Sequence, residues 1–208
     1  MRKPRGFTVL EMLVVGAVAL VILVLLTDLF VTAMRRTQDG RLRVDMQQRA
    51  IFAVRRWEDD IERVSARSVV LKPAEPAAVS MTAADAVNSN GTITWSKTIV
   101  CWGLLREERK LIRDTYPPEV PAFAEPLTSA APYLPTYLEL DSLIKETSGA
   151  EKTMCEDVEE FSVADSFGGA ELDKQPLVFK LKLRRPLSTA QNIGEFSIER
   201  RYTLRNSY

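Results

Sequence analysis

The sequence predicts an α+β fold in which one long N-terminal helix packs on an antiparallel β-sheet. No proline occurs between Pro4 and Pro73, so nothing interrupts a helix over that stretch. In the second half of the chain, apolar and polar residues alternate in several short runs, which is typical of strands with one buried face. At 208 residues the chain has room for a membrane segment and one ordinary domain.

The first part of the helix is apolar enough to span a membrane. Between Phe7 and Phe30 the polar residues are Thr8, Glu11, Thr27 and Asp28. As a helix, this stretch would extend ~36 Å at ~1.5 Å per residue, which exceeds a hydrocarbon core of ~30 Å. We therefore expect residues 7–34 to form a transmembrane helix.

Glu11 is the unusual residue of this segment. A carboxylate inside a spanning helix costs roughly 2.5–3.5 kcal/mol on insertion scales, so it usually has a partner and a function. We expect Glu11 to have such a partner. The plainer alternative places it among the lipid headgroups, because it lies only four residues after Phe7.

Beyond the span, the pattern predicts an amphipathic continuation of the helix over residues 35–66. The apolar residues there recur at gaps of four, three, four and three and form one stripe: Ala50, Val54, Trp57, Ile61 and Val64. Opposite charges four residues apart, Arg55 with Asp59 and Arg56 with Asp60, are expected to support the exposed face. We interpret the stripe as packing on the protein's own sheet, with a dimerising coiled coil as the alternative.

Strands are expected from about residue 92 to 208. Lys72 to Ala86, rich in alanine and containing two prolines, is interpreted as a loop. The expected strands cover 92–101, a hairpin over 100–116 that turns near residues 107–108, and runs around 161–163, 177–183 and 196–204. Residues 116–135 hold six of the eleven prolines and are predicted to be an irregular surface insertion, with a partner-docking segment as the alternative.

Composition disfavours several functions. The chain has no histidine, which excludes a nucleophile activated by histidine and histidine-based metal sites. Its formal net charge is zero, so no overall field favours nucleic acid. The acidic cluster at 156–160 lacks the spacing and turn glycine of a calcium loop and is interpreted as a solvated edge. We expect no enzyme activity, no cofactor and no metal.

The two cysteines, Cys101 and Cys155, are too few and too far apart in the sequence for a zinc site. In an oxidising compartment they would form one bridge, and in the cytosol they would be free thiols. The compartment therefore decides between these two states.

The segment Gly6-Phe7-Thr8-Val9-Leu10-Glu11-Met12-Leu13-Val14-Val15, preceded by Arg2, Lys3 and Arg5, resembles the processing signal of type IV pilins and type II secretion pseudopilins. That family has a short basic leader that ends in glycine, followed by phenylalanine and by glutamate as the fifth mature residue. The resemblance implies that residues 1–6 are removed by a prepilin peptidase and that Phe7 is N-methylated. It also implies that Glu11 pairs with the terminal amine of a neighbouring subunit, although a pair within one helix is the alternative.

The same resemblance implies a pilin fold, a bacterial inner-membrane location with the N-terminus cytoplasmic, and a periplasmic domain over residues 35–208. In that compartment we expect Cys101 and Cys155 to be bridged. The partners implied are other pseudopilins or minor pilins, which contact the helix and the soluble domain. No nucleic acid is expected.

Two features point to a minor subunit that initiates or caps a pseudopilus or pilus. Asp28 stands where major pilins commonly have proline, and residues 195–206 are similar to the last strand of J-type minor pseudopilins and PilW-type minor pilins. The alternatives are a major pilin, an adhesin-like subunit at a filament tip that binds through residues 116–135, and a membrane-anchored periplasmic enzyme.

Overall fold

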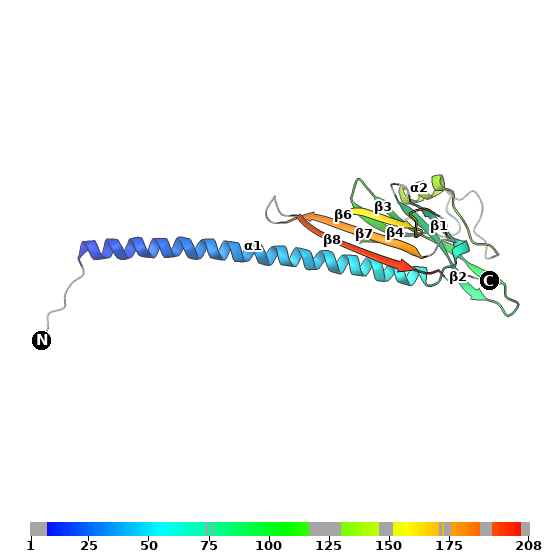
Figure 1. The fold of residues 1–208 in the computed structure, drawn as a ribbon, viewed down its shortest axis with the longest axis horizontal. Coiled ribbons are helices and arrows are strands. Elements are labelled where there is room, and N and C mark those ends of the chain that lie inside the picture. The colour runs from blue at the N-terminus through cyan, green and yellow to red at the C-terminus, as the bar shows by residue number, and fades with distance from the viewer. Residues whose placement is uncertain are drawn as a thin grey trace.

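The structure, a computed structural model, describes residues 8–73, 75, 77–116, 130–145, 152–170, 172, 176–187 and 193–204. It is α+β, as the sequence predicts, with one long N-terminal helix and two antiparallel sheets (Figure 1). The N-terminal half of the helix projects away from the sheets as a shaft, and the sheets lie along one side of its C-terminal half (Figure 1). Gly6, Phe7 and residues 117–129 of the proline-rich insertion lie outside the described residues.

The shaft and its continuation form helix α1, Val9–Ile61. The predicted stripe is buried, with Ala50, Val54, Trp57 and Ile61 on α1 and Val64 shortly after it, so the helix packs on the protein's own sheets. The helix ends at Ile61 rather than near residue 66, and the 3₁₀ turn η1, Ala66–Ser68, leads into the first strand. On the exposed face Arg56 pairs with Asp59 at 3.6 Å, three residues on rather than four.

The larger sheet is a five-stranded antiparallel meander in the order β1-β2-β3-β4-β5. Its strands are β1 Val69–Lys72, β2 Ala78–Val87, β3 Ile93–Leu105, β4 Lys110–Tyr116 and β5 Lys152–Cys155. The predicted hairpin is confirmed, because β3 and β4 pair from Ile99 with Tyr116 to Leu105 with Lys110.

The smaller sheet has three antiparallel strands in the order β6-β7-β8. They are β6 Val158–Ala164, β7 Leu177–Pro186 and β8 Ile193–Tyr202, which confirms the three strands expected in this part of the chain. Leu177, Phe179, Leu181 and Leu183 are buried, while Lys180 between them is exposed. The period of two thus sets which face of β7 enters the core.

The loop predicted over Lys72–Ala86 is wrong, because most of it is strand β2. Residues 78–82 of this strand are buried on both sides of the sheet, so their sequence does not alternate between apolar and polar. Small residues such as Ala78 and Ser80 fit this double burial, and they produced an alanine-rich pattern that is typical of a loop.

The core lies where α1 and the three-stranded sheet meet one face of the five-stranded sheet. Trp57 of α1 is fully buried at this meeting point. Its ring lies 5.6 Å from that of Trp102 on β3, edge to face, and 5.1 Å from that of Phe179 on β7. One side chain of the helix therefore contacts both sheets, and aromatic contacts of this kind stabilise beyond the area that they bury.

A second, smaller core lies on the opposite face of the five-stranded sheet, under the helix α2, Tyr137–Lys145. Leu140, Leu143 and Ile144 of α2 pack there. Ile144 covers Gly103 of β3 so closely that a Cβ at that position would lie 2.4 Å from its Cδ1. The glycine thus allows the helix to approach the sheet.

Candidate functional site

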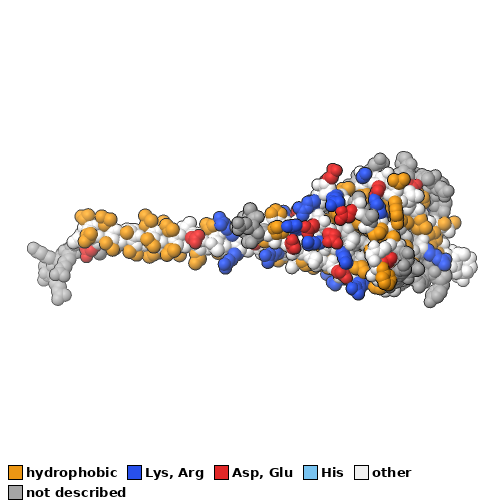
Figure 2. All heavy atoms as spheres, turned by 45° about the horizontal axis from the view of Figure 1, so that its top comes forward, with side chains coloured by type: hydrophobic (Ala, Val, Ile, Leu, Met, Phe, Trp, Pro, Cys, Tyr) orange, Lys and Arg blue, Asp and Glu red, His pale blue; other side chains and the backbone are white. Residues whose placement is uncertain are grey.

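The most distinctive surface of the molecule is the apolar N-terminal half of α1. Its large hydrophobic side chains range in exposure from 38% at Val31 to 82% at Val9. Hydrophobic side chains cover the shaft, whereas acidic and basic side chains are concentrated on the part of the molecule that carries the sheets and on the adjoining part of the helix (Figure 2). Since exposed apolar area of this extent is unfavourable in water, it indicates a membrane or a protein partner. Helix α1 is long and apolar enough to cross a membrane.

At the start of this helix, Glu11 forms a capping box with Thr8. The Glu11 amide donates to the Thr8 hydroxyl at 3.3 Å. In return, Oε2 of Glu11 accepts from the Thr8 amide at 2.8 Å and from its hydroxyl at 3.0 Å. Glu11 therefore has a structural role within its own chain that the sequence analysis did not anticipate, since a capping box satisfies amides that no helical carbonyl reaches.

At its other end, α1 is fixed to the five-stranded sheet by the buried carboxylate of Asp60. Arg113 on β4 donates to it through Nε at 2.7 Å and through Nη2 at 2.9 Å. The indole of Trp102 donates to the same carboxylate at 2.9 Å. The arginine and the aspartate side chains are each 9% exposed. The predicted exposed pair of Asp60 with Arg56 is therefore wrong, because the sheet offers Asp60 three better donors.

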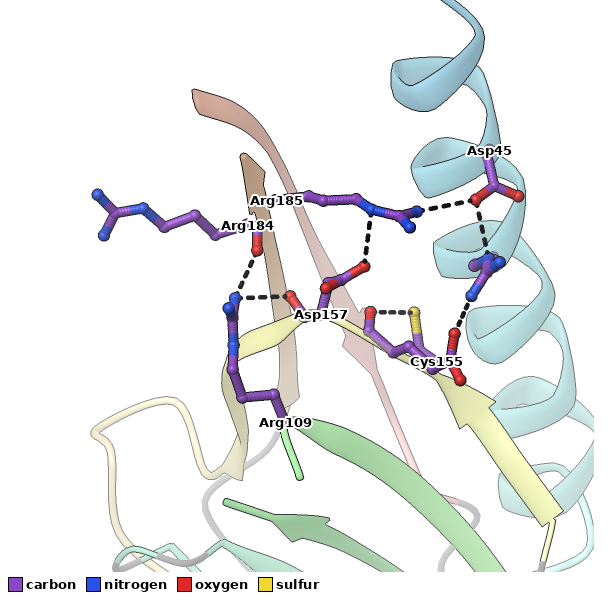
Figure 3. A network of polar contacts seen from close by, with 8 residues as sticks. Asp45, Arg109, Cys155, Asp157, Arg184 and Arg185 are labelled. Atoms are coloured by element: carbon purple, nitrogen blue, oxygen red, sulfur yellow. Dashed lines mark hydrogen bonds and ion pairs between the residues drawn. The ribbon is translucent and has the colours of Figure 1, made fainter. Parts of the chain in front are cut away.

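A second polar junction holds the C-terminal half of α1 at Asp45 and Arg49, near the edge of the five-stranded sheet (Figure 3). Arg49 lies between Asp45, at 3.1 Å on the same helix, and Glu156 after β5. These two acids raise the pKa of Arg49, and the hydrogen bond that Arg49 donates to Glu156 is the larger cause. Arg185 of β7 extends the network to Asp45 at 3.5 Å and to Asp157 at 3.4 Å. Acidic and basic side chains thus alternate along this network, which joins α1 to the turn after β5 and to β7.

Two residues with a left-handed backbone conformation, Arg109 and Asp157, join the two sheets beside this junction. Arg109 has a φ of 53° and Asp157 a φ of 60°, values that non-glycine residues adopt only at some cost. The Arg109 side chain donates to the carbonyls of Asp157 and Arg184 (Figure 3). The amide of Val158 donates back to the Arg109 carbonyl at 2.9 Å. The turn from β5 into β6 is therefore held by the turn between β3 and β4.

The predicted disulfide is wrong, because both cysteines are free and buried. Cys101 lies opposite Asp114 on β4, whereas Cys155 lies opposite Leu111 on the same strand. Asp114 and Leu111 are three residues apart on β4, and successive residues of a strand point to opposite faces of the sheet. The two thiols therefore lie in different cores, Cys101 under α2 and Cys155 beside α1. A bridge needs Cα atoms within ~7 Å and Cβ atoms that point toward each other.

The acidic cluster at 156–160 is used in ion pairs. Glu159 pairs with Lys182 and with Arg184, each at 2.7 Å, and these two cations lower its pKa, Lys182 first. Glu156 and Asp157 belong to the junction of Figure 3. Among the described residues no group of three or more acidic or cysteine side chains is placed to hold a metal.

The contacts that Asp60 and Arg49 of α1 form with the sheets, and the roles of Arg113 and Arg185 in them, were not predicted from the sequence. Charged residues on an amphipathic helix are usually assigned to solvent, and no local pattern distinguishes those that face a sheet edge.

The helix α2 was also missed, although its signal is local. Thr136 and Glu139 form a capping box. The Glu139 amide donates to the threonine hydroxyl at 3.3 Å, and the glutamate carboxylate accepts a hydrogen bond from the Thr136 amide at 2.7 Å.

Comparison with protein-family models, with curated proteins and with solved structures found no match for this chain. The functional argument therefore depends on the residues and the geometry described above.

Proposed function

We propose that this chain is a minor pilin-like subunit, anchored in a bacterial inner membrane and assembled through α1 into a pseudopilus or pilus. The observation that carries the proposal is the division of α1 into two halves within one unbroken helix. Its C-terminal half is the core of the soluble domain, while its N-terminal half is apolar and exposed. A rigid helix of this kind suits a subunit whose domain must keep a fixed position relative to a bundle of neighbouring helices.

The two polar junctions support this role. Asp60 and Arg113 fix the end of the helix, and the network around Arg49 fixes it about three turns earlier. With two attachment points along the helix, the domain cannot swivel about the axis of α1. An anchor that served only to retain a domain at the membrane would need neither junction.

The proposed assembly contact involves Glu11. Cleavage after Gly6 would leave a charged amine on Phe7 at the start of an apolar helix, and such a charge needs a partner when water is excluded. Oε2 of Glu11 accepts both hydrogen bonds from Thr8, and Oε1 accepts none from the described residues. The carboxylate can therefore cap its own helix and also accept from the amine of a neighbour.

Intact-mass and N-terminal peptide analysis of the protein from its native envelope tests the proposal. The mature chain should begin at Phe7 and carry one methyl group on its amine. A mature terminus within residues 16–27 would indicate ordinary signal-peptide processing and would reject the assignment. The abundance of the chain in sheared filaments then separates a minor subunit from a major pilin, and ligand binding by the chain would favour the adhesin-like alternative.

A further inference from the structure

A cluster of arginines follows directly after the apolar part of α1. Between Phe7 and Met34 the sequence contains no lysine or arginine. Residues 35–43 then contain four arginines, which we call the arginine collar: Arg35, Arg36, Arg41 and Arg43. Asp39 is the single acidic residue among them, so the segment is strongly basic. Basic side chains accordingly gather where the shaft meets the part of the molecule that carries the sheets (Figure 2).

The arginine collar is not used by the soluble domain. All four side chains are exposed, and none of them forms an ion pair with a residue that the structure describes. The next arginine along α1, Arg49, by contrast lies between two acids. The first buried residue of the helix is Met46, about 16 Å beyond Arg35 along the axis. The guanidinium groups of the collar are therefore available to a partner from outside the chain.

The directions of the four side chains indicate what kind of partner this is. At about 100° per residue, Arg36 and Arg43 lie within about 20° of each other around the helix. Arg35 lies about 100° to one side of Arg36, and Arg41 lies about 140° to the other side. A neighbouring helix covers one side of α1 and would leave two of these three directions unused. A membrane surface surrounds the helix and meets all three.

The axial positions match the headgroup layer of a bilayer. This layer is ~5–8 Å thick on each side, the difference between a bilayer of ~40–45 Å and a hydrocarbon core of ~30 Å. If the hydrocarbon ends at Met34, Arg35 and Arg36 lie within this layer. Arg41 and Arg43 lie about 10 and 13 Å above Met34, and helical side chains lean toward the N-terminus, which here is the membrane side. Because the potential of an anionic surface extends about 10 Å at 0.1 M salt, all four charges lie within its reach.

The chemistry of the collar suits phosphate. A guanidinium group donates two parallel hydrogen bonds to the oxygens of one phosphate, which a lysine cannot do. The position of the collar also calls for a function, since basic residues beside a span normally favour the cytoplasmic side. In the proposed orientation the collar lies on the other side, and the leader residues that balance it, Arg2, Lys3 and Arg5, are removed with the leader.

We propose that the arginine collar binds the phosphate groups of anionic phospholipids in the leaflet from which the soluble domain emerges. Contacts on several sides of the helix fix the depth of α1 in the bilayer and hold the domain at a set height above it. The inference rests on one part of the proposed function, the membrane anchoring by α1, and it is independent of leader cleavage and of assembly with other subunits.

The lipid selectivity of the chain, purified from its native membranes, tests this inference. The protein is reconstituted in phosphatidylcholine bilayers that contain a small share of spin-labelled phosphatidylglycerol or spin-labelled phosphatidylcholine. Electron paramagnetic resonance then measures the fraction of each labelled lipid that the protein immobilises. The wild type should prefer phosphatidylglycerol, and the preference should fall as salt rises, because salt screens exposed charges.

Replacement of all four collar arginines by glutamine should lower this preference by more than about tenfold, and Arg36→Gln alone should lower it by up to about fivefold. Any leader that is still attached contributes equally to every variant. Arg55→Gln is the matched control, because Arg55 is exposed on the same helix but lies about 30 Å beyond Arg35. It should keep the wild-type preference. Unfolding of each variant, followed by tryptophan fluorescence, confirms that the domain is intact.

An undiminished preference for phosphatidylglycerol in the four-glutamine variant overturns the inference. Inorganic phosphate should displace the labelled lipid no better than chloride at equal ionic strength, and stronger displacement would mean that the collar binds free phosphate rather than a lipid surface. Loss of co-purifying subunits without a change in lipid preference would assign the arginines to an acidic protein neighbour and would also overturn it. None of these results decides the proposed function, which depends on the mature terminus at Phe7 and on the Glu11 variants.

Discussion

Asp60 and Arg113 lie 53 residues apart in the sequence and form a two-pronged ion pair, with donor to acceptor distances of 2.7 and 2.9 Å. The carboxylate also accepts a hydrogen bond from the indole of Trp102, so the last turn of α1 is joined to the neighbouring strands β3 and β4. Because both charged side chains are largely buried, each depends on the other for its neutralisation. Loss of one partner therefore costs far more than the pair itself contributes.

Asp60→Asn should lower the free energy of unfolding by ~3–5 kcal/mol, because it leaves the Arg113 charge buried without a partner. Thermal or urea unfolding of the chain in detergent, followed by tryptophan fluorescence, measures the change. The double replacement Asp60→Leu with Arg113→Met should recover most of the loss. Arg56→Ala is the control, since it removes an exposed pair that contributes ~0–1 kcal/mol. An Asp60→Asn protein as stable as the wild type would contradict the role of the pair.

Trp57→Ala should destabilise the protein by ~3–5 kcal/mol, because it opens a cavity where the helix and both sheets meet. The same unfolding measurement applies, with Trp95 and Trp102 as the remaining fluorophores. Phe52→Ala provides a control on the same helix, since Phe52 is 59% exposed and its loss should change stability little. Equal effects of the two substitutions would mean that the aromatic cluster is not the centre of the core.

Cys101 and Cys155 should both be reduced in protein taken from the native envelope. Each is buried in a separate core, and burial raises the pKa of both thiols, so the reactive thiolate is scarce. Non-reducing peptide mapping after alkylation in denaturant should find two labelled cysteines. Alkylation of the folded chain near neutral pH should be slow by comparison. A linked Cys101 and Cys155 peptide would show that the strand register is different.

Stability should fall as the pH rises above 9.0. Burial raises the pKa of the Cys155 thiol from 9.0 to about 12 in the folded chain, so the unfolded chain loses its proton first. The contribution is therefore complete below pH 9.0 and is lost as the pH approaches about 12. One proton corresponds to about 1.4 kcal/mol per pH unit. Cys155→Ala should lessen this slope even if it lowers stability overall, and part of the slope should remain because burial also raises the pKa of the Cys101 thiol. A slope equal to that of the wild type would exclude the Cys155 thiol as a source.

The parts of the fold that the sequence predicted correctly are those in which one face alone is buried. The stripe from Ala50 to Val64 marked the helix, and the alternation from Leu177 to Leu183 marked β7. Strand β2 was missed for the opposite reason, since burial on both of its faces removes the alternation. Helix α2 begins directly after the proline-rich segment that ends at Pro135, and its capping box of Thr136 and Glu139 is the local signal that could have identified it.

The residues of the candidate site likewise differ in how far the sequence alone could predict their roles. Glu11 was identified from a local anomaly, a charge within an apolar run. The disulfide and Asp60 depend on strand register, which places Cys101 opposite Asp114 and Cys155 opposite Leu111. A shift of one residue exchanges the two faces of a strand, and no short pattern in this sequence fixes the register of β3, β4 and β5.

Glu11 has two roles to separate, since it caps its own helix through Thr8 and is proposed to neutralise the amine of a neighbour. Glu11→Gln distinguishes them, because a glutamine at this position can still close a capping box while it removes the charge. Thr8→Ala is the complementary variant, which removes the cap and keeps the carboxylate. If the charge contact holds subunits together, Glu11→Gln should fail to assemble and Thr8→Ala should assemble.

The experiment measures co-purification of each variant with its partner subunits, alongside mature size in the membrane fraction. Glu11→Gln and Glu11→Leu should both be inserted and processed, because neither changes the Gly6 junction and both remove a costly intramembrane charge. Both should be absent from the assembled fraction, where an unpaired Phe7 amine is withdrawn from water. Recruitment of a processed Glu11→Gln protein at the wild-type level would falsify the contact between subunits. Glu11 would then act only as the cap of α1, and Thr8→Ala should reproduce any defect that Glu11→Leu causes.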